Sequence, residues 1–401
     1  MDCAKFKLKE ISYHITDGEH CSVQNSEDGG FYLLSNKNII DGNIVFGEDE
    51  RKISKETFDK INKRTKLSKG DLVISTVGTL GKLSIIKEIP NYDFQRSVGI
   101  IKPNCSVVDV EYLYYYMQQS HVQKKLTCGS SGAIQKCIFI NQLKDFEVQL
   151  PSLSIQHRLA SALSSFDKRI ENLRAQNRVL EQTAKTIYDY TFLQCAGHQT
   201  TYNKTLNRNI PAEWEIDNLY RIADFTNGLA CQKYRPITEK EKLPVIKIRE
   251  MHDGVTADTE FVRSDIPEKV IVNPGDLLFS WSASLEVMMW NGVKGGLNQH
   301  IFKVTPKEYF SLYFVYFQLK DYIGNFKRMA EARKTTMGHI TTDHLNQSRI
   351  AIPDEETMKR FSSLVTPLFK KQLVNSQQIE TLTTQRNTLL PLLMTGQVEV
   401  M

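Results

Sequence analysis

Few residues in this sequence could carry out catalysis, and none of them completes a catalytic set. A metal-dependent nuclease needs clustered carboxylates beside a lysine, which together hold a divalent cation and a phosphate. The one E-x-K tripeptide, Glu50-Arg-Lys52, follows Asp41 in a loop of acidic and basic residues. Short motifs match by accident, so we interpret this loop as solvated. We interpret His339 and His344 as loop residues, because the nine histidines are scattered without a metal-ligand pattern.

Signatures of other enzyme classes are absent from the sequence as well. It has no Pro-Pro dipeptide, and therefore no N-P-P-[YF] loop of the kind that amino-methyltransferases use. It has no G-x-x-x-x-G-K-[ST] loop to cradle the phosphates of a nucleotide. Cys128, Ser130 and Ser131 have no assignable base that would activate them as nucleophiles. The residue types favour binding over catalysis.

Two glycine-containing loops have the composition of nucleic-acid contacts. One is Cys128-Gly-Ser-Ser-Gly-Ala-Ile-Gln-Lys136, and the other is Arg333-Lys-Thr-Thr-Met-Gly-His339. Small, hydroxylated and basic residues on a turn suit phosphates and base edges. A plain surface loop explains the same residues equally well.

Basic residues gather in two places, although the formal net charge is only +5. Between Arg51 and Lys69, eight basic residues stand against Glu56 and Asp59, which is the type of patch that neutralises phosphates. A second basic cluster stands against Glu331 alone and consists of Lys327, Arg328, Arg333 and Lys334. A charged stretch is often only a solvated face, and the stronger indication is that both halves have one.

The composition predicts a cytoplasmic protein of two or three domains. Its 401 residues are 41% hydrophobic and 24% charged, as in ordinary soluble proteins. No apolar run reaches the roughly 18 residues of a membrane span, and the charged start lacks a signal-peptide core. Seven cysteines without a C-x-x-C pair indicate free thiols in a reducing compartment.

The elements that must position the binding residues occur twice. Six anchors recur in the same order, which indicates an internal repeat. For example, Gly70-Asp-Leu-Val-Ile-Ser75 matches Gly275-Asp-Leu-Leu-Phe-Ser280, and Asp17-Gly18 matches Asn227-Gly228. Runs of Val, Ile and Phe closed by Asp-Gly turns predict short strands in each copy. An aromatic helix is expected from Tyr112 and another near Tyr309.

A long heptad pattern follows each globular copy. Apolar or small residues recur every three or four positions from Leu159 to Thr191, with Asn177 in the one gap. No Pro or Gly occurs from Ser154 to Phe192, so we expect a rod of roughly 58 Å at about 1.5 Å per residue. The copy from Phe361 to Leu393 has the same phase, and its seam is weakened by Gln372, Asn375 and Arg386. Asn177 is a candidate for fixing the helix register.

These patterns predict an α+β fold with two tandem mixed α/β globular domains and two long helices. The helices are expected to pair as an antiparallel coiled coil, which gives the chain an internal pseudo-two-fold symmetry. Two amphipathic helices packed separately on two domains are the alternative. The predicted segments are domain 1 at 1–150, helix 1 at 151–195, a linker at 196–210, domain 2 at 211–352 and helix 2 at 353–401.

The sequence resembles the specificity subunits of type I restriction-modification systems over essentially its whole length. Asp17-Gly-Glu-His20 resembles the opening of a target recognition domain, and Pro211-Ala-Glu-Trp214 resembles the start of the second one. Leu150-Pro-Ser-Leu-Ser-Ile-Gln156 and Ile352-Pro-Asp-Glu-Glu-Thr-Met358 resemble the proline-led starts of the family's helices. The family often has Glu-Gln at the helix starts, and this chain does not. Its second domain also lacks the D-G-x-H opening.

The resemblance implies a DNA-binding subunit without an active site or cofactor of its own. Each recognition domain would read one half of a split site in double-stranded DNA, and the helices would set the spacing. The helices would also dock two modification subunits, which bring S-adenosylmethionine and methylate adenine. Separate restriction and translocase subunits would bring ATP, Mg²⁺ and the nuclease. No membrane is expected as a partner.

Polar side chains on the predicted loops are the candidates for DNA contact, because Gln, Asn, Arg, Lys and Ser suit readout of the major groove. In the first half these are His20, Lys37, Asn38, Ser75, Thr76, Lys82, Arg96, Ser97, Ser130, Ser131 and Lys136. In the second half they are Arg249, Ser280, Trp281, Ser282, Asn298, Gln299, His300, Arg333, Lys334 and Thr335.

Two other classes of protein remain open at the level of sequence. One is a self-contained DNA nuclease or modification enzyme with divergent motifs. The other is a coiled-coil scaffold that binds no nucleic acid. Salt-sensitive binding to duplex DNA separates the scaffold from a DNA reader, because phosphate contacts release counterions.

Overall fold

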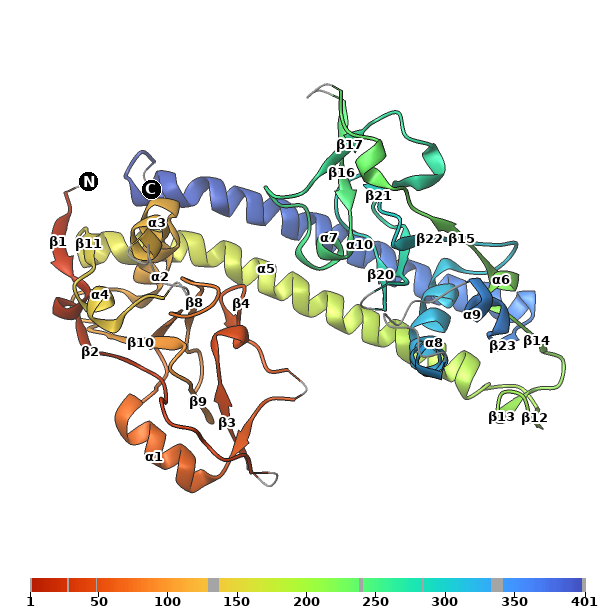
Figure 1. Ribbon diagram of the computed structural model, residues 1–401, viewed down its shortest axis with the longest axis horizontal. Helices are drawn as coiled ribbons and strands as arrows, with labels where there is room; N and C mark the ends of the chain where they lie inside the picture. Colours follow the sequence, from red (N-terminus) through yellow and green to blue (C-terminus); the bar gives the residue numbers. More distant parts are fainter. Residues whose placement is uncertain are drawn as a thin grey trace. The chain divides into compact units, whose positions relative to one another are not determined.

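A computed structural model describes residues 2–26, 29–47, 49–128, 137–237, 241–282, 285–332 and 342–398. The chain forms two compact units (Figure 1). Unit 1 contains Met1–Arg169 and Leu382–Met401, and unit 2 contains Ile170–Thr381. Each unit therefore holds one globular domain together with part of both long helices.

Unit 1 is built around an antiparallel sheet with the strand order β2-β10-β7-β8. Its central strand β7 is buried along its whole length, as expected for a short run of Leu, Val and Ile. A second sheet has the order β6-β3-β9, in which β3 and β9 run parallel. The elements of unit 1 that precede the first long helix are, in chain order, β1 Ala4–Lys7, η1 Leu8–Glu10, β2 Ser12–Asp17, β3 Phe31–Leu34, η2 Asn36–Asn38, β4 Ile39–Ile40, β5 Asn43–Ile44, β6 Lys52–Ile53, α1 Lys55–Thr65, β7 Leu72–Ser75, β8 Leu83–Ile85, β9 Tyr92–Phe94, β10 Val98–Pro103, α2 Val110–Gln118, α3 Ser120–Cys128, α4 Ile140–Lys144 and β11 Glu147–Leu150.

Unit 2 repeats this plan with the sheet order β15-β22-β19-β20. A second sheet, β17-β16-β21-β18, again contains one parallel pair, β16 with β21. Its elements are β12 Thr200–Asn203, β13 Arg208–Pro211, β14 Glu215–Asp217, α6 Leu219–Ile222, β15 Ala223–Asn227, η4 Cys231–Lys233, β16 Lys242–Ile246, α7 Ile248–Asp253, β17 Phe261–Arg263, η5 Glu268–Val270, β18 Ile271–Val272, β19 Leu277–Ser280, β20 Glu286–Met289, β21 Gly295–Leu297, β22 Ile301–Pro306, α8 Leu312–Ala332, α9 Thr342–Gln347 and β23 Ile350–Ile352.

The equivalent orders of the two sheets β2-β10-β7-β8 and β15-β22-β19-β20 confirm the internal repeat, and the anchors have local physical causes. Gly70 and Gly275 precede the matching strands β7 and β19 with φ of +91° and +96°, a conformation in which glycine has no steric penalty. The aspartate after each glycine closes the turn: Asp71 accepts a hydrogen bond from the Ser68 amide at 2.8 Å, and Asp276 accepts one from the Asn273 amide at 2.7 Å.

The two long helices pack antiparallel within each unit. Helix α5 spans Leu153–Tyr188 and passes into a π-helical turn, η3 Asp189–Leu193, while α10 spans Glu355–Met394. In unit 1, Leu159 and Leu163 near the start of α5 share a buried cluster with Leu393 near the end of α10. In unit 2, the opposite ends meet, with Ala184 packed in the same cluster as Phe361. The predicted pairing of the two seams is confirmed.

The polar residues of the seam contact one another or charged partners. The amide nitrogen of Asn375 donates to Asn177 Oδ1 at 2.9 Å, and Asn177 Nδ2 donates to Ser376 Oγ at 3.2 Å. Arg386 Nη1 lies 2.6 Å from Asp167 Oδ1. The positions that interrupt the apolar pattern therefore match across the helix pair.

Two local features differ from the expectations. The segment interpreted as a linker contains the hairpin β12-β13, in which Asn203 pairs with Arg208. The Asp17-Gly18 pair does not make a turn and instead lies at a close crossing of strands, whereas Asp41 and Gly42 have positive φ and do turn the chain. Hydropathy along the described helices identifies no membrane-spanning candidate.

Candidate nucleic-acid interface

Gly18 marks the point where the end of β2 crosses the turn between β9 and β10. The Gly18 amide donates to Val98 O at 3.1 Å, the Glu19 amide donates to Phe94 O at 2.7 Å, and the Arg96 amide donates to Glu19 O at 2.9 Å. A Cβ atom at Gly18 would lie 2.1 Å from Phe94 O. Only glycine permits this approach, and the crossing fixes the backbone on both sides of it.

Two further loops of unit 1 join the same crossing. The Gln95 amide donates to Leu34 O at 2.8 Å, and the Thr76 amide donates to Ser97 O at 2.9 Å. Asn36 Nδ2 donates to Val77 O at 3.0 Å. Residues 17–20, 35–38, 76–82 and 95–97 thus come together from four separate parts of the sequence, and we refer to them as loop cluster 1.

Unit 2 builds the same arrangement from the matching residues. The Gly228 amide donates to Ile301 O at 3.1 Å, the Gln299 amide donates to Leu229 O at 2.8 Å, and the Trp281 amide donates to His300 O at 3.2 Å. A Cβ atom at Gly228 would lie 2.2 Å from Asn298 O. Residues 227–230, 247–249, 281–282 and 298–300 form loop cluster 2.

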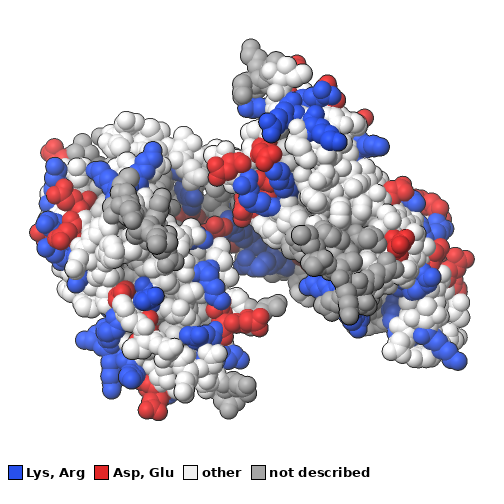
Figure 2. All heavy atoms as spheres, viewed as in Figure 1, with Lys and Arg blue, Asp and Glu red and all other residues white. Residues whose placement is uncertain are grey.

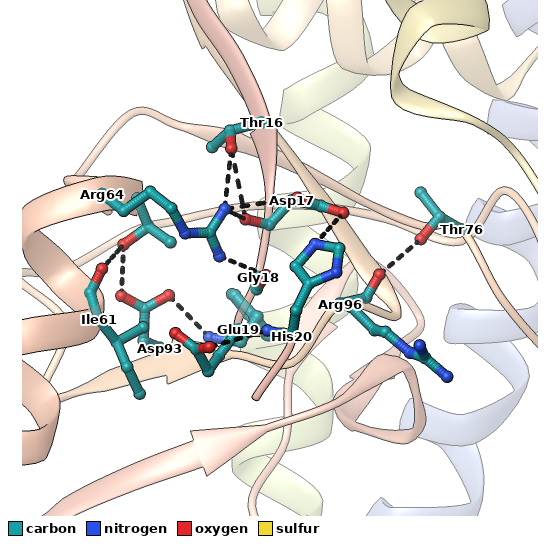
Figure 3. Close-up of polar contacts among 12 residues, drawn as sticks. Thr16, Asp17, Gly18, Glu19, His20, Ile61, Arg64, Thr76, Asp93 and Arg96 are labelled. Atoms are coloured by element: carbon teal, nitrogen blue, oxygen red, sulfur yellow. Dashed lines mark hydrogen bonds and ion pairs between the residues drawn. The ribbon is translucent and has the colours of Figure 1, made fainter. Parts of the chain in front are cut away.

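Four predicted contact residues of loop cluster 1 present exposed side chains: His20, Lys37, Lys82 and Arg96. His20 Nε2 lies 2.8 Å from Asp17 Oδ2, and Lys37 Nζ lies 3.3 Å from Glu50 Oε2. Arg96 extends from the β9-β10 turn, while its carbonyl accepts a hydrogen bond from Thr76 Oγ1 at 3.3 Å (Figure 3). Ser97 is half-buried, and its Oγ accepts the Asn36 amide at 3.2 Å.

Three predicted contact residues of unit 1 are buried and stabilise the loops from inside. Asn38 Nδ2 donates to Val45 O at 2.9 Å and to Glu50 Oε1 at 2.6 Å. Ser75 Oγ donates to Thr79 O at 2.6 Å and accepts from the Lys82 amide at 2.8 Å. Thr76 is only 3% exposed. These side chains hold the backbone of the loops and do not face an incoming ligand.

In unit 2 the predicted residues also divide by exposure. Ser280 is fully buried, and its Oγ accepts the Glu286 amide at 3.1 Å, while Ser282 and Asn298 are each 8% exposed. Trp281, Gln299 and His300 are half-buried. Trp281 Nε1 donates to Asn227 Oδ1 at 3.2 Å, and its ring lies 5.6 Å from the His300 ring. A half-exposed indole beside polar groups suits contact with a base or sugar.

Arg249 lies at the start of α7 and contacts both this helix and the segment that follows it. Its Nη2 is 2.7 Å from Glu250 Oε1 and 2.9 Å from Asp258 O, while the side chain remains 49% exposed. The remaining candidates lie outside the described residues: Ser130, Ser131, Lys136, Arg333, Lys334 and Thr335.

A polar groove of about 600 Å³ opens beside loop cluster 1. Its lining includes Ser35, Lys37 and Gln95 from the loop cluster and the segment Asp49–Lys52. At Glu50, burial raises the pKa, but hydrogen bonds from the Gly47 amide, Asn38 and Lys37 outweigh burial and lower it overall. Glu50 is therefore an anionic anchor for the lysine and amide on the groove wall.

Arg64, in the last turn of α1, ties this helix to loop cluster 1 (Figure 3). Its guanidinium donates to Asp17 O at 2.9 Å and to Thr16 Oγ1 at 3.2 Å, and it also contacts Gly18 O. Behind it, burial raises the pKa of Asp93, which accepts a hydrogen bond from Thr65 Oγ1 at 2.5 Å. The arginine fixes the carbonyls of the Asp17-Gly18 crossing.

Sequence reasoning missed several residues of this surface. Asn25, Ser26 and Gln95 line the groove. Arg64 belongs to the predicted basic patch, but its hydrogen bond to Asp17 O was not predicted. Gln95 could have been suggested by its place beside Arg96, but Asn25 and Ser26 carry no sequence signal that separates them from ordinary loop residues. Across the ranges described above, no three His, Cys, Asp or Glu side chains gather as metal ligands do.

Comparison with known proteins assigns this repeated architecture. The family model described as "Type I restriction modification DNA specificity domain" matches residues 2–182 and 211–384. The chain belongs to this family. It contains two tandem target recognition domains and is a type I restriction-modification specificity subunit.

Relatives within the specificity family align along nearly the whole chain. The type I restriction enzyme MjaIX specificity subunit of Methanocaldococcus jannaschii is 27% identical, and the alignment covers 98% of this chain and 93% of that one. The HindI specificity subunit of Haemophilus influenzae is 20% identical over 83% of this chain and 87% of its own. The crystal structure of the type I restriction-modification S subunit from M. genitalium matches with a TM-score of 0.56 at 14% identity, covering 98% of this chain and 96% of that one.

Proposed function

We propose that loop clusters 1 and 2 each read one half of a bipartite sequence in double-stranded DNA. The observation that carries this proposal is that unit 1 and unit 2 assemble the same backbone crossing at Gly18 and at Gly228 and surround it with different polar side chains. A shared frame with unlike side chains is what two readers of unlike half-sites require, because side chains at base edges decide which bases are accepted.

The exposed side chains indicate how each half is read. Arg96, Lys37 and Lys82 carry donors suited to the N7 and O6 acceptors of guanine. Gln299 in loop cluster 2 carries the paired donor and acceptor that match adenine, and Trp281 offers a flat apolar face. The buried residues Asn38, Ser75 and Ser280 shape the loops and are not part of the proposed base contacts.

The long helices and partner subunits complete the proposed function. Helices α5 and α10 set the spacing between the half-sites and dock two modification subunits, which supply S-adenosylmethionine and methylate adenine. Restriction and translocase subunits supply ATP, Mg²⁺ and DNA cleavage. In this proposal the chain itself catalyses nothing and holds no cofactor, and it acts in the cytoplasm, where the DNA is.

Methylome sequencing of the source strain with and without this gene tests the function. We expect one methylated motif, made of two short specified parts separated by unspecified bases, to disappear when the gene is deleted. An unchanged methylome, or loss of a continuous motif, contradicts the proposal. Methylation or cleavage of DNA by the purified chain alone would support an enzyme instead.

A substitution at Arg96 tests the assignment of loop cluster 1. Replacing Arg96→Ala should relax specificity at one position of one half-site by about 1 to 3 kcal/mol. Arg169→Ala is the matched control, because Arg169 is also exposed and lies on α5, away from the loop cluster. Equal discrimination by both variants and the unmodified protein in competition binding would remove Arg96 from the proposed contacts.

A further inference from the structure

Helix α1 is a rigid platform in unit 1. Ile61 and Thr65 on its inner face are buried, and Phe58 stacks on Phe31 with ring centroids 4.5 Å apart. Thr65 Oγ1 and Asn62 Nδ2 both donate to Asp93, at 2.5 and 3.4 Å. Ser54 caps the helix by accepting the Thr57 amide at 3.2 Å. Side chains on the outer face therefore project from a fixed backbone.

Three lysines and two acidic residues share the outer face of α1. Lys55, Lys60 and Lys63 are exposed and line a shallow depression of about 560 Å³ together with Glu56 and Asp59. None of the three lysines makes an ion pair with a residue in the described ranges. Figure 2 shows blue atoms gathered at lower left, where Figure 1 places α1.

Both ends of α1 adjoin the surface proposed to read DNA. At its C-terminal end, Arg64 Nη1 donates to Asp17 O at 2.9 Å, within loop cluster 1. The segment that leads into the helix includes Arg51 and Lys52, which line the polar groove together with Gln95. A molecule seated against loop cluster 1 and the groove would extend along α1.

The lysine face is not a requirement of the repeated fold. Unit 2 has the short helix η5 and the strand β18 between β17 and β19, where unit 1 has α1 between β6 and β7. Residues 261–275 of unit 2 contain two basic and two acidic residues, whereas residues 51–69 of unit 1 contain eight basic and two acidic ones. In unit 2 the shared architecture forms with a segment of balanced charge at this place. Folding alone therefore does not explain the positive charge of α1.

We propose that α1 binds the phosphates of double-stranded DNA next to the half-site read by loop cluster 1, as a sequence-independent clamp. The inference rests on the proposed function, because it needs DNA at loop cluster 1. Exposed lysines on a rigid helix attract phosphates as point charges, and each phosphate neutralised releases condensed counterions. The face supplies affinity and register, while the loop cluster supplies sequence preference.

Salt-dependent DNA binding by the full-length chain, assembled with its modification subunits, tests this clamp. The variant K55Q/K60Q/K63Q should reduce the slope of log K against log salt by about 2 to 3, since each phosphate contact contributes about 0.9. The recognised sequence and the ratio of specific to non-specific binding should change little. K55R/K60R/K63R should keep the slope of the unmodified protein, which separates loss of charge from damage to the helix.

K204Q/K269Q/K294Q is the control for net charge, because these three lysines are exposed in unit 2: Lys204 in the β12-β13 turn, Lys269 in η5 and Lys294 in the loop before β21. It removes the same charge and should leave the slope within about 1 of the unmodified value. An unchanged slope in K55Q/K60Q/K63Q, with sequence-specific binding intact, overturns the clamp and leaves the proposed function standing. An equal drop in both variants also overturns it.

Two further outcomes distinguish other failures. If the α1 variant keeps its slope but assembles more weakly with the modification subunits, the lysine face binds an acidic protein surface and the clamp is wrong. If the unmodified assembly binds DNA that carries the methylome-derived site no more tightly than DNA that lacks it, the proposed function itself fails. Glutamine preserves helix propensity at exposed positions, so circular dichroism and thermal unfolding of the variant should match those of the unmodified protein.

Discussion

An amide pair in the helix seam, with Asn375 buried and Asn177 half-buried, decides how tolerant this position is to substitution. Asn375 is fully buried and donates to Asn177 Oδ1 at 2.9 Å. Replacing only Asn375→Leu leaves Asn177 without this partner and should lower the free energy of unfolding by about 1 to 3 kcal/mol. N177L/N375L should recover most of that loss, because two apolar residues then face each other.

Chemical denaturation of the two single variants and the double variant measures this coupling. The interaction free energy follows from the double-mutant cycle. Additive effects of the two substitutions would contradict a direct partnership between the amides. The helix pair should also lose register specificity in the double variant, since an asparagine pair in the seam disfavours shifted alignments.

Glu181 makes the stability of unit 2 depend on pH. Burial raises the pKa of this carboxyl, but hydrogen bonds from Lys320 at 2.8 Å and Tyr316 at 2.5 Å outweigh burial and hold the pKa below its ordinary value of 4.5. A lowered pKa in the folded state means that the carboxylate stabilises the fold above pH 4.5. This stabilisation is lost as the pH falls through the lower, folded-state pKa.

Thermal unfolding of the unmodified chain and of Glu181→Gln between roughly pH 3 and pH 7 tests the linkage. This pH range brackets the pKa of an ordinary carboxyl group. The difference in melting temperature should be largest near neutral pH and shrink on acidification. A constant difference across the range would show that Glu181 acts through shape and not through charge. Glu380→Gln on α10 is the control, because Glu380 is exposed.

Residue types selected loops that the fold brings together, but they did not separate exposed side chains from buried ones. His20, Lys37 and Arg96 are exposed at loop cluster 1, whereas Ser75 and Asn38 are buried. A serine that accepts a backbone amide and a serine that faces solvent look alike in a sequence. What separates them is whether a neighbouring loop supplies a partner, as Lys82 does for Ser75 at 2.8 Å. That information comes only from the fold.

At the scale of elements, periodicity carried most of the prediction. The absence of Pro and Gly from Ser154 to Phe192 and the heptad pattern predicted α5, and both seams were found paired. The strand crossings at Gly18 and Gly228 were not predicted, because they depend on contacts between residues far apart in sequence. Arg386 was expected to weaken the seam, yet Asp167 across the helix pair lies 2.6 Å from it.

The length of the helix pair can be changed without changing its seam. Inserting seven residues in heptad phase beside Asn177, with a matching heptad beside Asn375, lengthens the pair by roughly 10 Å. On the proposed function, the unspecified gap between the two half-sites should grow by about three base pairs. Both specified parts should stay the same in methylome sequencing.

A seven-residue insertion in the β12-β13 hairpin, between Asn203 and Arg208, is the matched control. It adds the same length of chain outside the helix pair and should leave the motif unchanged. An unaltered gap in the helix variant would argue against a spacing role for α5 and α10. A changed gap in the hairpin variant would argue that the connection sets the spacing.

At the scale of the whole molecule, the proposed function predicts that the two recognition domains act independently. The sheets β2-β10-β7-β8 and β15-β22-β19-β20 have equivalent strand orders, but the exposed loops of the two domains differ. Replacing residues 215–352 by the matching segment of a relative with another specificity should change one specified part of the methylated motif and preserve the other. The reciprocal exchange of residues 4–150 should change only the other specified part. A change of both parts in either exchange would contradict independent reading.

The sequence order of unit 1 has a consequence for its biosynthesis. Leu393 and Met394 belong to the same buried cluster as Leu8, Leu113 and Leu163, so unit 1 is closed by the last stretch of the chain. A ribosome makes the first part of this core long before it makes the last. The nascent protein must keep an unfinished apolar surface protected while all of unit 2 is synthesised. Chaperones that shield growing chains should matter more for the first recognition domain than for the second.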